Sequence, residues 1–463
     1  MAARRSTSSY KENYSDCLEY IDTYWDRVIH KPSKKVIEQH VVTIPQPYIT
    51  PNPRWLGKFG YMFYWDSFFM FRGLIGTKRE WILQNQVDNF IYLFTRYGVI
   101  PNFNAPVSMG RSQPPFLSSM ILDTYNGYYF PAIRKSKLQE ALFNLKPHKK
   151  WLKKAVEVAK KEYEQVWIDK DCHYNHSVKG QTLARYGDRD IGYAHSSELE
   201  SGWDFTSRFY HRCNEFLPID LNVLLYKYER DFAKIAFHLE DGVEERKWQK
   251  IAEKRKKEIN RLMWDEKKGF FYDYCYTDNR ISDFLSLASF TPLWAGLATG
   301  DQAARMIKKL HIFETDYGLV IDAKESLPPE VNLDVIPSRY RPAIEYVLKP
   351  KQWDYPNIWP PLEYLTVIGM LKYGFVEDAM RIMDKSVRAH ASLYRKYNTF
   401  LEKINGETGD RAANYSYALQ EGFGWTNAVF YRYCHILDEI NSGKDIYKSP
   451  KPKDPPFGLS ILH

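Results

Sequence analysis

The stretch FAKIAFHLEDGVEERKWQKIAEKRKKEINRLMW (232–264) has the pattern of a helical hairpin: helix, turn and helix. Its second helix ends in WDEKKGFFYDY (264–274), where a glycine turn predicts a short strand or a small hairpin. A helix that buries one apolar face needs a partner, and a helix joined to it by a short turn supplies one. This stretch therefore predicts two packed, antiparallel helices.

Similar hairpins recur on the C-terminal side. VEDAMRIMDKSV (376–387) places Val376, Ala379, Met380, Met383 and Val387 on one helical stripe, and DQAARMIKKL (301–310) repeats the pattern. Each follows an apolar helix and a glycine turn, in EYLTVIGMLKYG (363–374) and LWAGLATG (293–300) respectively. No Gly/Ser linker separates the hairpins, so the sequence predicts one large all-α body whose helix pairs close into a ring.

The limits of this body follow from composition. Of the 463 residues, we assign 46–440 to a single helical domain. Residues 1–45 are expected to form a partly irregular N-terminal extension, and the Lys- and Pro-rich residues 441–463 a C-terminal tail.

The distribution of charges and of cysteines limits which classes of partner and which cellular compartment we expect. The net charge is +8, but its excess lies in runs with helical spacing, HKKWLKK (148–154) and EERKWQKIAEKRKKE (244–258), which favour solvated helix faces over a nucleic-acid site. No apolar run is long enough for a membrane span. Five cysteines stand singly and the N-terminus is polar, so we expect a reducing, cytoplasmic setting. As a separate expectation, the protein is a monomer or a homodimer.

Long polar and aromatic loops separate the hairpins and are expected to meet at one end of the ring. They contain no phosphate-binding glycine loop, no metal-ligand cluster and no cysteine-nucleophile context, so we predict no cofactor and no metal. They do contain carboxylates beside aromatic residues, at Asp66, Asp204, Asp354, Glu402 and Glu421. Two carboxylates suit cleavage of a glycosidic bond, and burial among aromatics suits the general acid, but context alone does not choose between Asp66 and Asp204.

Six stretches together resemble the trehalase family of glycoside hydrolases, family 37. In the order of that family's motifs they are FYWDSFF (63–69), IPNFNAPVSMGRSQPPF (100–116), ESGWDFTSRF (200–209), IDLNVLLY (219–226), QWDYPNIWPP (352–361) and LQEGFGWTN (419–427). The likeness spans roughly residues 55–430. It implies an (α/α)6 toroid with catalytic loops at one end, and an inverting mechanism.

By the same resemblance, Asp204 is the general acid. Glu402 in FLEKIN (400–405), which corresponds to the family's EKY segment, is the general base that activates water. The wall of the sugar pocket is implied to contain Lys58, Trp65, Asp66, Asn102, Arg111, Ser112, Gln113, Arg185, Gly202, Gln352, Trp353, Asp354, Ser416, Gln420 and Trp425. The substrate is then a small disaccharide or glycoside, with α,α-trehalose as the first expectation.

Departures from the family pattern keep two alternatives open. Lys58 stands where the family has an arginine, Tyr186 and Gly187 replace a Pro-Glu pair after Arg185, and Ser416 stands where the family has a glutamate. The insertion NGETGD (405–410) is similar to family 63, whose members include glycosylglycerate hydrolases. The first alternative is therefore a family 63-like α-glycosidase, and the second, of another class, is a sugar-binding protein without turnover.

Overall fold

The computed structural model describes residues 9–32, 41–53, 60–127, 147–169, 171, 173–189, 194–327, 337–341, 349–413 and 417–443. Within these residues, no helix combines the length and the apolar character that crossing a membrane requires.

Helices dominate the chain. The α-helices are α1 (Tyr10–Asn13), α2 (Ser15–Val28), α3 (Tyr64–Phe71), α4 (Trp81–Tyr97), α5 (Leu117–Gly127), α7 (Pro147–Glu162), α8 (Ala194–Glu200), α9 (Ile219–His238), α10 (Gly242–Met263), α11 (Thr291–Trp294), α12 (Gly300–Ile307), α14 (Pro360–Lys372), α15 (Val376–Tyr397) and α16 (Gly424–Asn441). Short 3-10 helices are η1 (Pro106–Ser108), η4 (Cys213–Glu215), η5 (Leu287–Phe290), η6 (Leu310–Ile312) and η7 (Lys324–Ser326), and η3 (Tyr163–Trp167) is a π-helix.

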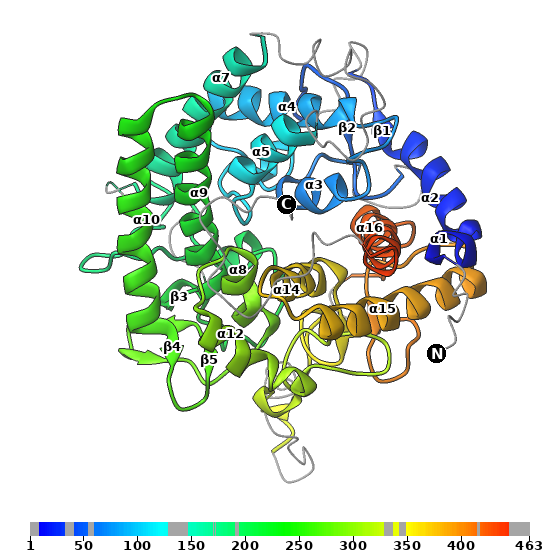
Figure 1. Ribbon diagram of the computed structural model, residues 1–463. Coiled ribbons are helices and arrows are strands. Elements are labelled where there is room, and N and C mark those ends of the chain that lie inside the picture. Colours follow the sequence, from blue (N-terminus) through cyan, green and yellow to red (C-terminus); the bar gives the residue numbers. More distant parts are fainter. Residues whose placement is uncertain are drawn as a thin grey trace.

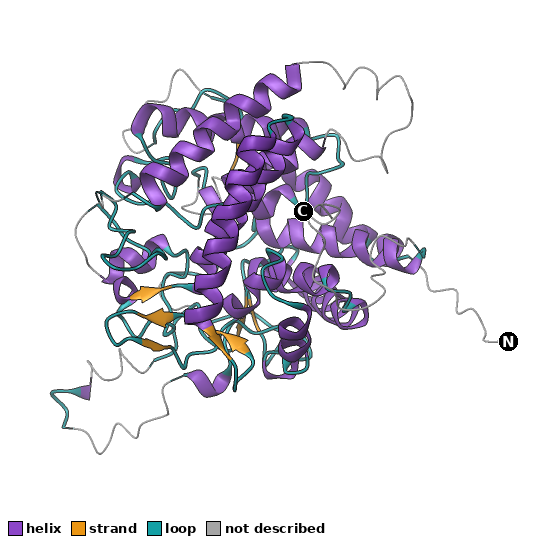
Figure 2. Cartoon of the chain, turned by 60° about the vertical axis from the view of Figure 1, so that its left-hand side comes forward, coloured by secondary structure: helices purple, strands orange, loops and turns teal. Residues whose placement is uncertain are grey.

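The strands are two residues long and antiparallel. They are β1 (Ile29–His30) with β2 (Tyr48–Ile49), β3 (Phe216–Leu217) with β6 (Tyr274–Cys275) and β7 (Arg280–Ile281), β4 (Trp264–Asp265) with β5 (Phe270–Phe271), and β8 (Asn357–Ile358) with β9 (Ile404–Asn405). Most lie to one side of the helical body (Figure 2). The hairpin expected after residue 264 is β4–β5, which confirms that prediction.

Among the described residues, six helices form a closed inner ring. Each contacts the next: α3 with α5, α5 with α9, α9 with α11, α11 with α14, α14 with α16, and α16 with α3 (Figure 1). The other six long helices, α2, α4, α7, α10, α12 and α15, alternate with them along the chain. Inner helices are buried on nearly every face, and all eight residues of α3 are buried. This arrangement confirms the (α/α)6 toroid.

Helix pairing follows the sequence patterns. α9 and α10 form the expected hairpin, and α14 packs against α15. On α15 the stripe positions Ala379, Met383 and Val387 are buried, whereas α14 is buried from Pro360 to Leu371. One apolar stripe thus marks an outer helix, and a helix that is apolar all round marks an inner one.

The segment before residue 45 also contributes to the toroid. Cys17, Ile21, Tyr24, Trp25 and Val28 form the buried face of α2 and belong to the same core as the inner helices. Their spacing of three, four or one residues is that of an amphipathic helix. The boundary at residue 45 stays a prediction, although α2 occupies the place of an outer helix.

The ring closes where α3 meets α16, and two glycines permit the close approach. A Cβ added at Gly73 would lie 2.7 Å from Trp25 Cζ2 and 2.8 Å from Ala428 Cα. A Cβ at Gly424 would lie 2.5 Å from Met70 Sδ, and the Gly424 N–H donates to the Pro51 carbonyl at 2.6 Å. The seam between the first and last inner helices therefore leaves no room for a side chain.

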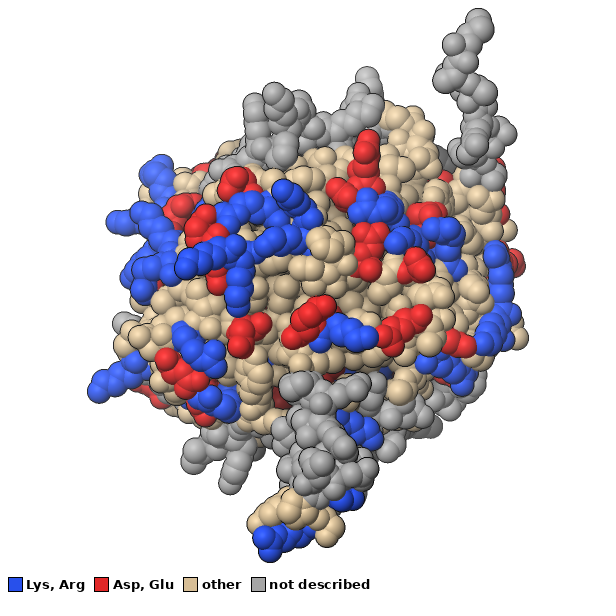
Figure 3. Space-filling model, turned by 90° about the horizontal axis from the view of Figure 1, so that it is seen from below, with Lys and Arg blue, Asp and Glu red and all other residues tan. Residues whose placement is uncertain are grey.

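The outer surface carries mixed charge. Figure 3 shows Lys and Arg side chains interspersed with Asp and Glu on the face seen from below. Several lysines and arginines of α7 and α10 are paired, as Lys160 is with Glu244 at 2.5 Å and Arg261 with Glu258 at 2.8 Å. The expectation that the basic runs are helix faces agrees with their positions on α7 and α10.

Gly73→Ala should destabilise the protein by about 1–3 kcal/mol, because the new methyl group must displace the α16 backbone or Trp25. Gly242→Ala is the matched control: a Cβ there meets only the end of the flexible Arg246 side chain at 3.3 Å, so its effect should stay within about 0.5 kcal/mol. Chemical denaturation of both variants measures the difference. Equal stabilities would show that the seam is loosely packed.

Candidate active site

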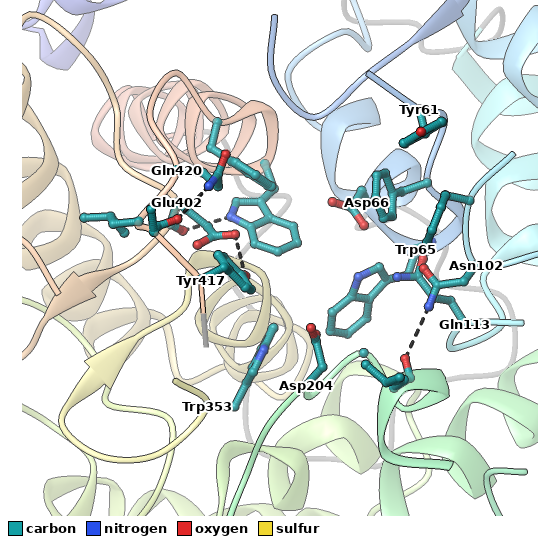
Figure 4. A pocket seen from close by; sticks show the side chains of 18 of the residues that line it. Tyr61, Trp65, Asp66, Asn102, Gln113, Asp204, Trp353, Glu402, Tyr417 and Gln420 are labelled. Atoms are coloured by element: carbon teal, nitrogen blue, oxygen red, sulfur yellow. Dashed lines mark hydrogen bonds between the residues drawn. The ribbon is translucent and has the colours of Figure 1, made fainter. Parts of the chain in front are cut away.

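A cavity of about 840 Å³ opens at one end of the toroid. Its lining comes from the segments that lead into five of the six inner helices and from the first turns of α3 and α16. Figure 4 shows the side chains that enter it. The lining residues are Tyr61, Phe63, Trp65, Asp66, Asn102, Phe103, Val107, Arg111, Gln113, Leu199, Gly202, Asp204, Trp353, Glu402, Tyr417, Ala418, Leu419, Gln420, Glu421, Phe423 and Trp425. The volume is in the range of small-molecule sites.

The first turn of α3 supplies Trp65 and Asp66. The backbone N–H of Trp65 donates to Gln113 Oε1 at 3.1 Å, which joins this turn to the loop before α5. Asp66 is 4% exposed, and its pKa lies well above the ordinary value, first because of burial and then because of the charges of Glu402 and Asp204. A helix N-terminus offsets part of the cost of a buried carboxylate.

Asp204 enters the cavity from the loop before α9. Gly202, two residues earlier, has φ +76°, and a Cβ there would lie 2.8 Å from the Trp65 ring, so this position requires glycine. Burial raises the pKa of Asp204 to about 7, with a further contribution from the charge of Glu402. Asp204 thus keeps its proton close to neutral pH, as a general acid must.

Asp354 holds the Asp204 loop from behind. One of its oxygens accepts from the Ser207 N–H at 2.7 Å and from Thr206 Oγ1 at 3.2 Å, and the other accepts from Ser207 Oγ and the Lys351 N–H, both at 2.7 Å. The residue is completely buried. Asp354 therefore fixes the chain that carries Asp204 and does not itself open on the cavity.

Tryptophans form the floor between the loops. Trp353 and Trp359 stack with ring centroids 3.6 Å apart and 5° between their planes. Trp353 also lies 5.7 Å from Trp65 and 5.5 Å from Trp203, and Trp425 lies 5.8 Å from Trp359. The prolines of QWDYPNIWPP and the β8–β9 pairing bring this loop beside the segment that carries Glu402.

Glu402 lies between the cavity and a set of fixed partners. Tyr417 Oη donates to Glu402 Oε1 at 2.8 Å, as Figure 4 shows, and Lys403 Nζ donates to Oε2 at 2.8 Å. The Glu402 carbonyl accepts from Trp425 Nε1 at 2.9 Å, and its N–H donates to the Gln420 carbonyl at 3.0 Å. Both the backbone and the carboxylate of Glu402 are thereby oriented.

Amides and one guanidinium complete the polar wall. Asn102 Nδ2 donates to the Leu199 carbonyl at 3.2 Å, and Gln420 Oε1 accepts from Asn52 Nδ2 at 3.2 Å. Arg111 lies 3.5 Å from the Asp188 carboxylate. Each of these groups is held in place and retains hydrogen-bonding capacity toward the cavity.

The structure gathers most of the sequence-predicted residues and separates the others. In the lining are Trp65, Asp66, Asn102, Arg111, Gln113, Gly202, Asp204, Trp353, Glu402, Gln420 and Trp425. Outside it, among the described residues, are Ser112, Arg185, Gln352 and Asp354. Lys58 and Ser416 lie outside the described residues, so their predicted contacts are left as predictions.

The four residues outside the lining support the wall from behind. Arg185 donates to the carbonyls of Asn175 and Asn214 and to Tyr276 Oη, each at 2.6 Å, so its guanidinium is occupied away from the cavity. Ser112 Oγ donates to the Ile100 carbonyl at 2.7 Å, and Gln352 Nε2 donates to the Asp204 carbonyl. Motif membership alone did not separate pocket residues from those that brace them.

Some lining residues escaped the sequence analysis. Tyr61, Phe103 and Tyr417 contribute rings to the wall, and Lys403 reaches Glu402 from outside the lining. Tyr61 lies two residues before FYWDSFF and Lys403 directly follows Glu402, a proximity that could have indicated them. Tyr417 follows a segment where the family pattern is lost, and no sequence signal pointed to its contact with Glu402.

One group of possible metal ligands occurs among the described residues, at Asp169, Asp171 and His173. His173 is exposed and its Nδ1 lies 2.8 Å from Asp169. None of the three lines the cavity.

A protonated carboxyl and a second carboxylate opening on one cavity are the groups that acid–base cleavage of a glycosidic bond requires.

Asp204→Asn should stabilise the protein at pH 8 and leave its stability unchanged below about pH 4. The folded protein raises the pKa of Asp204 from 3.8 to about 7, so it binds a proton that the unfolded chain has lost, and the wild type loses stability as the pH rises through this window. The amide avoids this loss, a gain of about 2–4 kcal/mol above pH 7. Urea denaturation at several pH values measures it.

Asp410→Asn is the control of opposite sign. Hydrogen bonds from Lys396 and then Tyr397 lower the pKa of Asp410 to about 2, so its substitution should destabilise the protein near neutral pH, by a smaller amount because the pair is exposed. If Asp204→Asn is no more stable than wild type at pH 8, the fold does not raise the pKa of Asp204 and the residue is not poised as an acid.

Comparison with known proteins places this site in a family. The Trehalase family profile matches residues 2–441. Among curated relatives, a periplasmic trehalase from Xanthomonas oryzae pv. oryzae is 29% identical over 440 residues, covering 89% of this chain and 72% of the relative. Another from Xanthomonas axonopodis pv. citri is 29% identical over 459 residues, covering 93% of this chain and 74% of the relative.

Solved structures show the same fold. Neutral trehalase Nth1 from Saccharomyces cerevisiae superposes with a TM-score of 0.66 at 24% identity, covering 94% of this chain and 80% of that one. GH63 mannosylglycerate hydrolase from Thermus thermophilus, in complex with glucose, gives 0.58 at 15% identity, covering 90% of this chain and 99% of that one.

The cytoplasmic location expected from the sequence is contradicted, since both Xanthomonas relatives are named periplasmic enzymes. Cysteine usage was a poor guide: Cys17, Cys213, Cys275 and Cys434 are free and buried, and buried thiols are inert in either compartment. The match over nearly the whole chain also removes the alternative of a sugar-binding protein without turnover. With its toroid and its family profile, the chain belongs to the trehalase family and is a glycoside hydrolase.

Proposed function

We propose that the protein hydrolyses α,α-trehalose to two glucose molecules by an inverting mechanism, with Asp204 as general acid and Glu402 as general base. The observation that carries this proposal is the pairing of two differently prepared carboxyl groups on one cavity. Burial raises the pKa of Asp204 to about 7, whereas Glu402 accepts hydrogen bonds from Lys403 and Tyr417. Burial favours a proton on Asp204, whereas the Lys403 ammonium group places a positive charge beside Glu402.

In the proposed reaction, Asp204 donates its proton to the glycosidic oxygen as the bond to the anomeric carbon breaks. Glu402 takes a proton from a water molecule, which attacks that carbon from the opposite face. One glucose then forms with inverted β configuration, and the other leaves as the α anomer. An inverting pair stands about 6.5–9.5 Å apart to leave room for the water, and entry of the two groups from separate loops suits such a spacing.

The charge of the cavity favours a neutral substrate. Its described lining contains four carboxyl groups, at Asp66, Asp204, Glu402 and Glu421, and one arginine, Arg111, which lies near Asp188. Glu421 is itself paired with Arg411 at 2.6 Å. A disaccharide with hydroxyl groups alone meets no repulsion here, whereas a glycoside of glycerate adds a further carboxylate. This balance supports trehalose over the family 63-like alternative.

The aromatic walls support a sugar of two rings. Trp65, Trp353 and Trp425 surround the carboxyl groups, and the ring centroids of Tyr61 and Phe103 lie 5.1 Å apart farther along the lining. Apolar ring faces accept the C–H faces of a pyranose while amides take its hydroxyl edges.

The names of the Xanthomonas relatives also favour a periplasmic location for this protein.

Proton NMR of the purified protein with trehalose tests the substrate and the stereochemistry together. We expect α- and β-glucose to appear in equal amounts before mutarotation mixes them. A sample that leaves trehalose intact but hydrolyses mannosylglycerate or glucosylglycerate would replace the trehalase proposal by the family 63-like one. Release of α-glucose alone would contradict inversion.

Asp204→Asn and Glu402→Gln should each lower kcat by at least about 10³-fold with little change in sugar affinity, because an amide has the shape of the acid but transfers no proton. Glu421→Gln is the matched control, since Glu421 also lines the cavity but is paired with Arg411. Initial rates and calorimetric binding measure both effects. An inactive Glu421→Gln beside an active Glu402→Gln would transfer the role of base to Glu421.

A further inference from the structure

Lys403 is a buried cation whose ammonium group touches the carboxylate of Glu402. The Lys403 and Glu402 side chains are each 1% exposed, and Nζ lies 2.8 Å from Oε2. Neighbours in sequence seldom pair in this way, since adjacent side chains usually point apart along an extended backbone. The loop bends here because the Glu402 carbonyl is held by Trp425 at 2.9 Å and by Thr426 at 3.3 Å.

Aromatic rings hold the ammonium group on two sides. Lys403 Nζ lies 4.6 Å from the ring centroid of Trp359 and 4.9 Å from that of Tyr417. Trp359 is in turn stacked on Trp353, so its position is fixed by the floor of the cavity. A cation between ring faces keeps its charge at a lower cost of desolvation than in an aliphatic pocket. The site is therefore built to keep one positive charge beside Glu402.

We propose that Lys403 is a positioning residue for the reaction: it fixes the Glu402 carboxylate in one rotamer and supplies the positive charge beside it while substrate excludes water. This inference rests on the proposed role of Glu402 as the base. Lys403 is absent from the cavity lining, so it acts through Glu402 and not on the sugar.

The need for this charge follows from the other groups around Glu402. Asp66 from α3 and Asp204 from the loop before α9 lie within electrostatic reach of Glu402, and the charge of Glu402 contributes to the raised pKa of each. The charge of Lys403 in turn lowers the pKa of Asp204. Arg111 faces Asp204 from the loop before α5 and lies near Asp188. Without Lys403, three carboxyl groups of the described lining would share the cavity with only this more distant cation.

Tyr417 and Lys403 divide the two oxygens of Glu402 between them. The pKa of Tyr417 is raised well above its ordinary value, first by burial and then by the charge of Glu402, so its hydroxyl remains a donor throughout the working pH range. The neutral Tyr417 hydroxyl orients the Glu402 carboxylate through a hydrogen bond to Oε1, whereas Lys403 places a positive charge beside Oε2. Loss of Lys403 should therefore change the pH dependence more than loss of the Tyr417 hydroxyl, which removes one neutral hydrogen bond.

The first test compares Lys403→Met with Tyr417→Phe in the full-length protein, using the glycoside that the wild type hydrolyses. Lys403→Met should lower kcat about 100-fold, leave KM within about threefold, and move the acidic limb of the kcat/KM profile to higher pH, because the carboxylate loses its counter-charge. Tyr417→Phe should lower kcat and move that limb by a clearly smaller amount, because it removes a neutral hydrogen bond and no charge. An unmoved acidic limb in Lys403→Met overturns the inference.

Lys227→Met controls for the loss of any buried lysine. Lys227 is 6% exposed and paired with Asp231 on α9, outside the cavity lining. This variant should lose thermal stability but retain the wild-type pH profile. If Lys227→Met moves the acidic limb as far as Lys403→Met does, the shift reflects general loosening and the proposal fails.

A double-mutant cycle with Glu402→Gln separates this inference from the proposed function. If Lys403 acts through the carboxylate, Lys403→Met should add less than about threefold to the loss of kcat in the Glu402→Gln protein, and should lower its melting temperature by much less than in wild type. Additive losses overturn the inference. The melting temperatures need no turnover, so the cycle decides the Lys403–Glu402 coupling even if trehalose is not the substrate.

Discussion

The contact between α3 and α16 makes this chain a ring, and the other features depend on it. The two helices begin about 360 residues apart in sequence, yet Gly73 and Gly424 let them approach until no side chain fits between them. Closure brings the N-terminal ends of the inner helices to one end of the molecule, and the loops that enter five of them line one cavity. The positive ends of helix dipoles thus surround a site rich in carboxyl groups.

Burial and charge then give similar side chains different chemical roles. Asp66, Asp204 and Glu402 share the cavity, but within the described part of the chain only Glu402 of these three forms an ion pair. Asp204 lies among tryptophans, and burial raises its pKa to about 7. Asp354, directly behind it, accepts four hydrogen bonds and holds the backbone of the loop that carries Asp204. Similar carboxyl groups thereby stand in different electrostatic surroundings within one pocket, which suits the acid and base roles proposed above.

The departures from the family pattern acquire different meanings in the structure. The insertion at 405–410 packs on the aromatic loop, where Tyr355 Oη donates to Glu407 at 2.7 Å, and it extends β9 beside β8. It therefore braces the segment that carries Glu402. Arg185 was expected to contact the sugar, but it donates its hydrogen bonds to backbone carbonyls and to Tyr276. The departures from the family pattern thus concern the support of the pocket as well as its lining.

The sequence by itself determined the helical hairpins, because apolar spacing depends only on the chain, and it determined the family, because motifs such as ESGWDF and QWDYPNIWPP stand in order. From the motifs it also named both carboxyl groups of the proposed mechanism. Only the tertiary structure decided that α2 joins the toroid, that Arg185 and Asp354 lie behind the wall, and that Tyr417 and Lys403 hold Glu402. These outcomes depend on contacts between distant segments and on side-chain direction, which one-dimensional spacing does not specify.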